Sequence, residues 1–274
     1  MAAKIVPLMP NAERYVEVFG GGASVLLARD PSGVETYNDL DRSLYDFFSV
    51  LSDPDKFLLF KRRVEALPVS RDFYNEYRSG WENEPDQIKR VAMWFYVARL
   101  SFSGRFGESV GYSVSESRRN MAISSSRWLS AIDRLPAIHA RLQRVQIENN
   151  DWRDVIDTHD DKDCLFYLDP PYIMSTRKSG GYAHELTDGD HADLVERLRT
   201  LKGSFVLSGY NSDIYAQLNE FSRRYDFKTA CHAAGRTKGS GLKGKGSALK
   251  IQARTECLWV KESAPSQLSI WGKK

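Results

Sequence analysis

The clearest chemistry in the chain lies in four residues that follow a short apolar run: Asp169, Pro170, Pro171 and Tyr172. Two consecutive prolines cannot continue a strand or donate from the backbone, so they fix the chain where the strand ends. The carboxylate of Asp169 and the proline carbonyls accept hydrogen bonds, and the ring of Tyr172 is a flat stacking surface. Acceptors beside an aromatic plate suit a planar base with an exocyclic amine. A rigid turn with a core tyrosine is the alternative that needs no ligand.

A second candidate site is the glycine run Gly20-Gly21-Gly22, which follows Phe19 at the end of another β-prone run. Glycines let the backbone turn tightly and approach a ligand closely. The spacing is not that of the dinucleotide-binding pattern, so a plain tight turn is the alternative. Asp39 lies twenty residues after Phe19, at the end of a second predicted strand, where a carboxylate can accept hydrogen bonds from ribose hydroxyls. Together these residues predict a site for an adenosine-containing cofactor.

The elements that must position these residues are short strands that alternate with helices, which is the pattern of an α/β fold. The predicted strands cover residues 15–19, 34–37, 145–148, 164–168 and 204–208. The predicted helices cover residues 23–29, 44–51, 88–100, 128–142 and 189–201. Because residues 56–144 read as mostly helical, we predict a domain in two parts, residues 1–54 and 146–274, interrupted by a helical insertion at 55–145.

Charge is distributed unevenly along the 274 residues, although the net charge is only +3. Residues 55–145 carry a net +6, and residues 232–254 hold six basic residues and no acidic one, which leaves the rest of the chain at −9. An acidic body with two basic segments indicates a polyanionic partner that dedicated parts of the chain hold. An ordinary solvated surface is the alternative.

Several classes of protein are excluded. The chain has no apolar run of eighteen residues and no signal-peptide pattern at its start, so we expect neither a membrane span nor secretion. Its three cysteines are far apart and odd in number, which argues against a disulfide framework or a structural zinc site and for a reducing cytosol.

The chain resembles the adenine-specific DNA methyltransferases of the Dam type, a family that phages and prophages also encode. The resemblance rests on residues 15–22 as the cofactor motif and 169–172 as the catalytic motif, with shorter matches at 150–152, 190–191 and 208–210. The order of cofactor motif, recognition insertion and catalytic motif matches the family's alpha arrangement. The resemblance implies a Rossmann-like, S-adenosylmethionine-dependent methyltransferase domain with a mainly helical target-recognition insertion. Cytosine-N4 enzymes usually carry serine at the first catalytic position, so Asp169 favours adenine.

The resemblance also implies a role for particular residues. S-adenosylmethionine would be bound by residues of both motifs and of the segments after two strands: Phe19, Gly20, Gly21, Gly22, Asp39, Leu40, Asp151, Trp152 and Asp169. Asp151 would meet the adenine amine of the cofactor, and Leu40 and Trp152 would border its ring. Asp190 would be the N-cap of the helix after the catalytic loop.

Methyl transfer of this kind needs neither a metal nor a covalent enzyme intermediate, because the sulfonium methyl is already activated. Asp169 and the Pro170 carbonyl would accept the two hydrogens of the target amine as charge develops on it. The adenine must leave the duplex to reach them, and Tyr172 would stack on the flipped base.

The expected partner is double-stranded DNA. Base-reading arginines are predicted in the insertion, at Arg105, Arg118, Arg119 and Arg127, with phosphate contact as the alternative for each. Phosphate-binding lysines are predicted in the Gly-rich stretch at residues 235–248, namely Lys238, Lys243 and Lys245. We expect a monomer in the cytoplasm of a bacterium or phage-infected cell, in the setting of DNA methylation or restriction-modification.

One departure from the family pattern concerns the start of the chain. The family opens with a Gly-Gly-Lys segment whose lysine helps to hold the cofactor, whereas residues 1–8 of this chain resemble the helix just after that segment. This departure motivates one alternative, a non-catalytic DNA-binding relic. A methyltransferase acting on RNA or on cytosine N4 is the other alternative that stays open.

Overall fold

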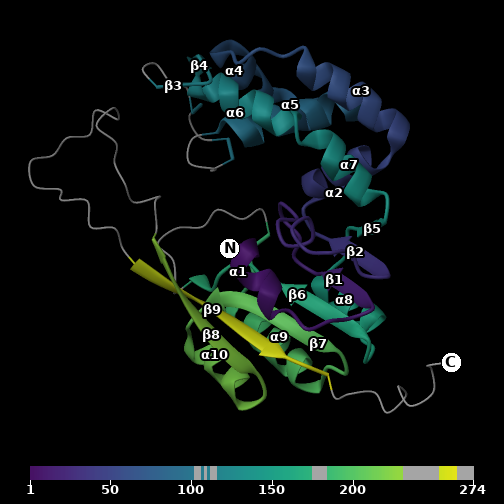
Figure 1. Ribbon diagram of the computed structural model, residues 1–274, viewed down its shortest axis with the longest axis vertical. Coiled ribbons are helices and arrows are strands. Elements are labelled where there is room, and N and C mark those ends of the chain that lie inside the picture. The colour runs from purple at the N-terminus through teal and green to yellow at the C-terminus, as the bar shows by residue number, and fades with distance from the viewer. Residues whose placement is uncertain (102–105, 108–109, 112–115, 175–183, 231–252, 264–274) are drawn as a thin grey trace, which may run out of the picture. The chain divides into compact units, whose positions relative to one another are not determined.

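The structure is a computed structural model that describes residues 1–101, 106–107, 110–111, 116–174, 184–230 and 253–263 (Figure 1). Arg105, Lys238, Lys243 and Lys245 lie outside these residues. The chain divides into two compact units, one of Tyr15–Asp157 and one of Met1–Arg14 with Thr158–Lys274. The division predicted from the sequence is a different one, because it separates a catalytic domain in two parts, residues 1–54 and 146–274, from a recognition insertion at 55–145. That division stays a prediction.

The unit of Tyr15–Asp157 contains a sheet with strand order β5-β2-β1. Its strands are β1 (Arg14–Glu17), β2 (Val34–Asn38) and β5 (Val145–Glu148). β2 and β5 are parallel, with Glu35 opposite Val145. β1 and β2 are almost entirely buried, as strands of a parallel sheet covered on both faces must be. The three strands predicted here are confirmed to within two residues at each end.

Helices make up most of the rest of this unit. They are α2 (Arg42–Ser52), α3 (Pro54–Glu65), α4 (Arg71–Gly80), α5 (Gln87–Leu100), α6 (Ile123–Ile132), α7 (Leu135–Leu142) and α8 (Trp152–His159), with a 3₁₀ turn η2 (Trp81–Asn83). α3, α4, α5 and α6 form one cluster (Figure 1). In an aromatic core, Phe95 of α5 packs against Phe47 of α2, Phe60 of α3 and Trp128 of α6. The prediction that residues 55–145 are mainly helical is confirmed.

Two predicted helices in this unit differ in the structure. Residues 128–142 belong to two helices rather than one, because Pro136 lies in the first turn of α7, where its missing N–H costs nothing. Residues 23–29 form successive turns and no α-helix. Ala23 has a left-handed backbone (φ 52°), and the Leu26 N–H is donated to the side chain of Glu17 rather than to a carbonyl one turn back.

The second unit contributes four strands, paired in the order β6-β7-β9-β8. Its strands are β6 (Cys164–Leu168), β7 (Ser204–Tyr210), β8 (Arg223–Ala230) and β9 (Ala253–Lys261). β6 and β7 are parallel, and β9 pairs antiparallel with both β7 and β8. β6 and β7 agree with the predicted strands, whereas β8 and β9 were not predicted. The last strand in sequence therefore lies inside this sheet.

Short helices complete this unit. They are α1 (Ala2–Ile5), η1 (Val6–Leu8), α9 (Asp188–Thr200), α10 (Asp213–Ala216) and η5 (Gln217–Glu220). The N-cap of α9 is Thr187 rather than Asp190. Asp190 is the N3 residue of a capping box, in which the Thr187 side chain accepts the Asp190 N–H and the Asp190 side chain accepts the Thr187 N–H. No helix among the described residues combines the length and the apolar character that crossing a bilayer requires.

Candidate functional site

The glycine turn after β1 is shaped by the side chain of Tyr37 on β2. A Cβ at Gly20 would lie 2.1 Å from the Tyr37 ring, so only glycine fits at this position without rearrangement. The Tyr37 hydroxyl donates to the Gly21 carbonyl at 2.8 Å, which holds the ring in place. Gly21 has φ +49°, and a Cβ at Gly21 or Gly22 would meet no atom within 4 Å. The backbone of Gly21 and Gly22 therefore borders open space that a ligand can approach.

Asp39 follows β2 and contacts the same turn. Its Oδ2 accepts the Gly21 N–H at 2.8 Å, and its Oδ1 accepts the Asp41 N–H at 2.8 Å. Each carboxylate oxygen has a further lone pair, and the residue is partly exposed, so Asp39 can still accept hydrogen bonds from a ligand. Asn38, beside it, links β1 to β5, because its amide donates to the carbonyls of Val18 and Asn150.

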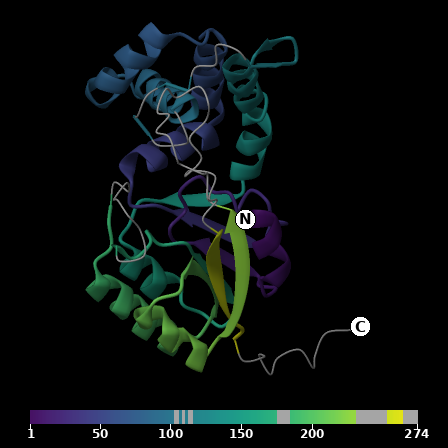
Figure 2. The same ribbon diagram turned by 90° about the vertical axis from the view of Figure 1, so that its left-hand side faces the viewer.

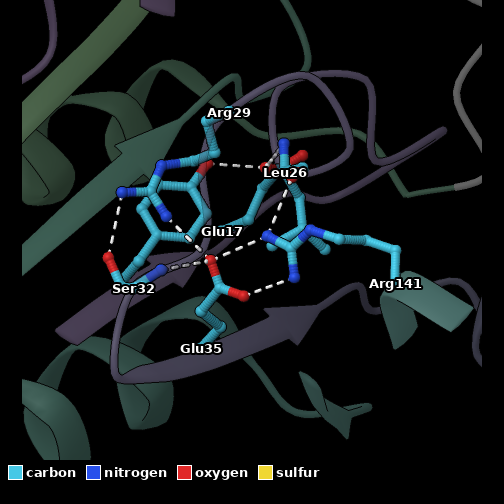
Figure 3. Close-up of polar contacts among 7 residues, drawn as sticks. Glu17, Leu26, Arg29, Ser32, Glu35 and Arg141 are labelled. Carbon is cyan, nitrogen blue, oxygen red and sulfur yellow. Dashed lines mark hydrogen bonds and ion pairs between the residues drawn. The ribbon is translucent and has the colours of Figure 1, made fainter. Parts of the chain in front are cut away.

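A buried carboxylate within β1 fixes the turns that follow the glycines (Figure 3). Glu17 is 1% exposed, and its Oε2 accepts hydrogen bonds from the Tyr15 hydroxyl at 2.6 Å and from the Leu26 N–H at 2.8 Å. Tyr15, Glu17 and Leu26 are thereby joined across the base of the turn. Charged groups are almost never fully buried without partners, so this acidic residue inside an apolar run was a signal that sequence reasoning missed.

The other predicted cofactor residues of this unit lie after β1, β2 and β5. Phe19 and Trp152 have ring centroids 6.3 Å apart, and Trp152 is buried. Leu40 is 43% exposed, which is high for a large apolar side chain. Asp151 accepts the Arg153 N–H at 2.9 Å at the start of α8 and stays partly exposed. The prediction that Asp151 follows a strand is correct, since β5 ends at Glu148.

The catalytic motif begins at the residue that follows β6, in the second unit. Asp169 is exposed to solvent, Pro170 is buried, and Tyr172 is half-buried. The Tyr172 ring packs against that of Tyr210 at the end of β7, with centroids 4.5 Å apart and planes tilted by 47°. The Tyr172 hydroxyl donates to Oε1 of Glu256 on β9 at 3.4 Å. Asp169, Tyr172, Ser208, Tyr210 and Glu256 thus form one polar and aromatic cluster.

The pKa of Asp169 is raised to about 7. Desolvation by the surrounding protein is the main cause, the negative charge of Glu256 adds to it, and a hydrogen bond from Ser208 opposes it. The residue is nevertheless exposed to solvent, so it does not lie in a closed core. A carboxyl group poised near neutral pH and open to a ligand is the signature of a functional acid or base.

A family model now accounts for both motifs. Residues 1–231 match the model of the D12 class N6 adenine-specific DNA methyltransferases. The chain belongs to this family. It is therefore an enzyme that methylates N6 of adenine in DNA, and the Dam-type resemblance and Rossmann-like methyltransferase fold predicted from the sequence are confirmed. Family membership favours DNA over RNA and adenine N6 over cytosine N4.

The predicted DNA-binding residues of this methyltransferase are only partly described. Arg118 and Arg119 lie on a hairpin of β3 (Ser117–Arg118) and β4 (Met121–Ala122). Its two-residue turn, Arg119-Asn120, has φ values of 57° and 58°, as a type I′ hairpin turn requires. The hairpin stands out from the helix cluster in Figure 2, and Arg118 and Arg119 are exposed. Arg127 is exposed on α6.

Sequence reasoning missed three residues that support the two motifs. Glu17 and Tyr37 support the glycine turn and the turns after it, and Glu256 contacts Tyr172 of the catalytic motif. Tyr37 has a pKa raised well above its usual value by burial and by Asp39, so it remains a neutral hydrogen-bond donor. Glu256 belongs to a strand that was not predicted. Among the described residues, no group of three or more His, Cys, Asp or Glu side chains is arranged to hold a metal ion.

Proposed function

We propose that this adenine-N6 DNA methyltransferase takes its methyl group from S-adenosylmethionine and transfers it to an adenine flipped out of duplex DNA. The observation that carries the proposal is the exposed, near-neutral carboxyl of Asp169, next to a proline pair and an aromatic pair. This is the set of acceptors and stacking surfaces that an adenine with its exocyclic amine needs.

The glycine turn and its neighbours fit an adenosine-containing cofactor. The open backbone at Gly21 and Gly22, the partly exposed Asp39 and the exposed Leu40 border one region of the unit that contains β1. Asp39 would accept hydrogen bonds from the ribose hydroxyls of the cofactor. Phe19, Leu40 and Asp151 would contact its adenine ring. When bound, the cofactor supplies an electrophilic sulfonium methyl. The protein's contribution is to hold it in a fixed orientation.

Asp169 and the Pro170 carbonyl would act on the target base. The N6 lone pair of adenine is delocalised into the ring, so the amine is a poor nucleophile until its hydrogens are held by acceptors. The Asp169 carboxylate and the Pro170 carbonyl would accept those two hydrogens and favour a tetrahedral nitrogen as positive charge develops on it. Stacking on Tyr172 would offset part of the cost of flipping the base.

DNA recognition would come from exposed cations. The hairpin carries Arg118 and Arg119 on a rigid turn, and the Arg119 guanidinium is held by the Ser130 hydroxyl at 3.2 Å. Arg127 lies on the adjacent helix α6. A guanidinium on a rigid support suits bidentate contact with guanine O6 and N7. Arg105 and the lysines Lys238, Lys243 and Lys245 are proposed from their sequence context alone, as a further base reader and as phosphate contacts.

The test is a substitution at the catalytic position with a matched control on the same strand. Asp169→Ala should abolish methyl transfer to duplex DNA and leave S-adenosylmethionine binding, measured by calorimetry, within a few-fold of the parent. Asp163→Ala removes an exposed aspartate just before β6, at the opposite end of the strand, and should leave both properties unchanged. Methyl transfer by Asp169→Ala within a few-fold of the parent would overturn the assignment. Absence of S-adenosylmethionine binding in the parent would overturn the cofactor proposal.

A further inference from the structure

Glu256 is a buried acidic residue that the family resemblance does not single out. It lies on β9, directly opposite Tyr210 of β7 in the antiparallel register. Its exposed fraction is only 9%, and among the described residues it forms no ion pair. A carboxylate that is buried without a cation is costly unless hydrogen bonds satisfy it. Its neighbours therefore indicate why it is there.

Those neighbours all belong to the catalytic cluster. Oε1 of Glu256 accepts a hydrogen bond from the Tyr172 hydroxyl at 3.4 Å. The Ser208 hydroxyl lies 3.5 Å from the same oxygen, and its single hydrogen can be donated either to Glu256 or to Asp169. The Tyr172 ring, held by this contact at its tip, packs on Tyr210 along its face. One side chain of β9 thus connects the loop after β6 to the end of β7.

We propose that Glu256 is a positioning residue for methyl transfer, which anchors Tyr172 by its hydroxyl and sets the electrostatic environment of Asp169 through its negative charge. The proposal rests on the proposed function of Asp169 and Tyr172. Asp169 follows β6 and Glu256 lies on β9, with β7 between them, and like charges repel, so the charge on Glu256 opposes ionisation of Asp169. This agrees with the raised pKa of Asp169, to which Glu256 contributes.

Other groups also face Asp169. Ser208 and Tyr210 come from β7, and Tyr172 comes from the catalytic loop itself. Tyr215 of α10 has a pKa raised by burial and by the charge of Asp169, and its hydroxyl lies 2.8 Å from Nδ1 of His191 on α9. The raised pKa of Tyr215 keeps it neutral at working pH values. Among the described residues, Glu256 is the charged group that raises the pKa of Asp169, so we expect its removal to change the titration of Asp169.

The proposal predicts that the pH midpoint of activity can be shifted to lower or to higher pH by different substitutions. If the Asp169 carboxylate accepts a hydrogen of the amine, activity rises as pH passes through the pKa of Asp169. Glu256→Gln keeps the size and an acceptor oxygen but removes the charge, so the midpoint should move to lower pH by about one unit. Ser208→Ala removes the hydrogen bond that favours the ionised form, so the midpoint should move to higher pH.

The experiment measures kcat against pH on a methylatable duplex at saturating S-adenosylmethionine. It compares the parent with Glu256→Gln, Ser208→Ala and the control Glu262→Gln, which changes an exposed glutamate just after β9. The control should keep the parental midpoint. Tyr172→Phe loses the contact with Glu256 but keeps the aromatic ring. When Glu256→Gln is added to Tyr172→Phe, the pH midpoint of kcat should still shift, because Asp169 loses its charged neighbour. Base capture should be no weaker in the double variant than in Tyr172→Phe alone, because the hydroxyl contact is already absent. A fluorescent base at the target position reports that capture.

Two outcomes would overturn the positioning role. One is a Glu256→Gln enzyme that unfolds at the parental temperature and keeps the parental midpoint. The other is a Tyr172→Phe enzyme that captures the base as tightly as the parent, because this variant removes the hydroxyl that Glu256 anchors, and this arm is decisive if Glu256→Gln fails to fold. In either case an inactive Asp169→Ala enzyme would show that the proposed function stands while the role of Glu256 fails. An active Asp169→Ala enzyme would overturn both.

Discussion

At the scale of single residues, two adjacent glycines of the cofactor turn differ in what they permit. Gly20 lies under the Tyr37 ring, which is pinned by its hydrogen bond to Gly21, whereas Gly22 faces open space and has no positive φ. The same substitution at the two positions should therefore have different consequences.

We predict that Gly20→Ala lowers the free energy of unfolding by about 1 to 3 kcal/mol, because the added methyl overpacks against a ring that cannot move away. Gly22→Ala should change it by less than about 1 kcal/mol. Urea unfolding of the three proteins at one pH measures both effects. Equal midpoints for the two variants would show that Tyr37 does not occupy the position described.

Sequence reasoning at this scale found Asp169 and Tyr172 but not Glu256, for a physical reason. The catalytic residues are contiguous and follow an apolar strand, so their types and order alone indicate their chemistry. Glu256 obtains its role from the pairing of β9 with β7, which brings together residues more than forty positions apart. Nothing next to Glu256 in the sequence marks that pairing.

At the scale of elements, Glu35 of β2 joins a strand to the last helix of the insertion (Figure 3). Its carboxylate is fully buried and accepts hydrogen bonds from Arg29 and from Arg141 of α7. Arg141 also donates to the carbonyl of Leu26 at 3.1 Å, in the turns after the glycines. The same cluster therefore supports the cofactor turn and the docking of α7.

We predict that Glu35→Gln lowers the free energy of unfolding by about 3 to 5 kcal/mol, because it leaves two buried guanidinium groups without their counter-charge. The control is Glu65→Gln, which breaks an i,i+4 pair with Lys61 on the surface of α3 and should cost at most about 0.5 kcal/mol. Chemical unfolding curves give both values. A loss for Glu35→Gln no larger than that of the control would mean that the buried cluster does not hold α7.

The helices and strands were predicted well where the local sequence pattern determines the secondary structure. They were predicted poorly where contacts with residues distant in the sequence determine it. The apolar runs of β6 and β7 and the helical periods of α2, α5 and α9 were correct within a few residues. Residues 23–29 have a helical composition, but the Glu17 carboxylate takes the Leu26 N–H that a helix needs. β8 is an outer strand of its sheet and carries polar residues, so it lacks the apolar run by which β6 was found.

At the scale of the whole molecule, the uneven charge predicts two kinds of contact with DNA. We expect the hairpin arginines to read bases, because the two-residue turn braces them, and the lysines of residues 232–254 to neutralise phosphates. Arg118→Ala should relax discrimination at one base pair by about 1 to 3 kcal/mol. Neutralising Lys238, Lys243 and Lys245 together should weaken binding to every duplex and flatten its dependence on salt, because fewer counterions are released.

Affinities for a cognate duplex and for single-mismatch duplexes, each measured at several salt concentrations, separate the two effects. The lysine variant should keep its preference for the cognate site, and Arg118→Ala should keep most of its salt slope. A lysine variant that loses specificity at an unchanged slope would show that the two segments have the opposite roles.

The position of β9 has a consequence for how the enzyme forms during synthesis. β9 is made after β8, yet it lies between β7 and β8, and among the described strands β9 is the one with which β8 pairs. A nascent chain that has reached residue 252 therefore has β6 and β7 but cannot attach β8, and β7 presents an open edge to any other strand. Glu256 arrives with β9, so the surroundings of Asp169 are completed in the same step that closes this edge. A growing chain cannot assemble its catalytic cluster before that strand emerges.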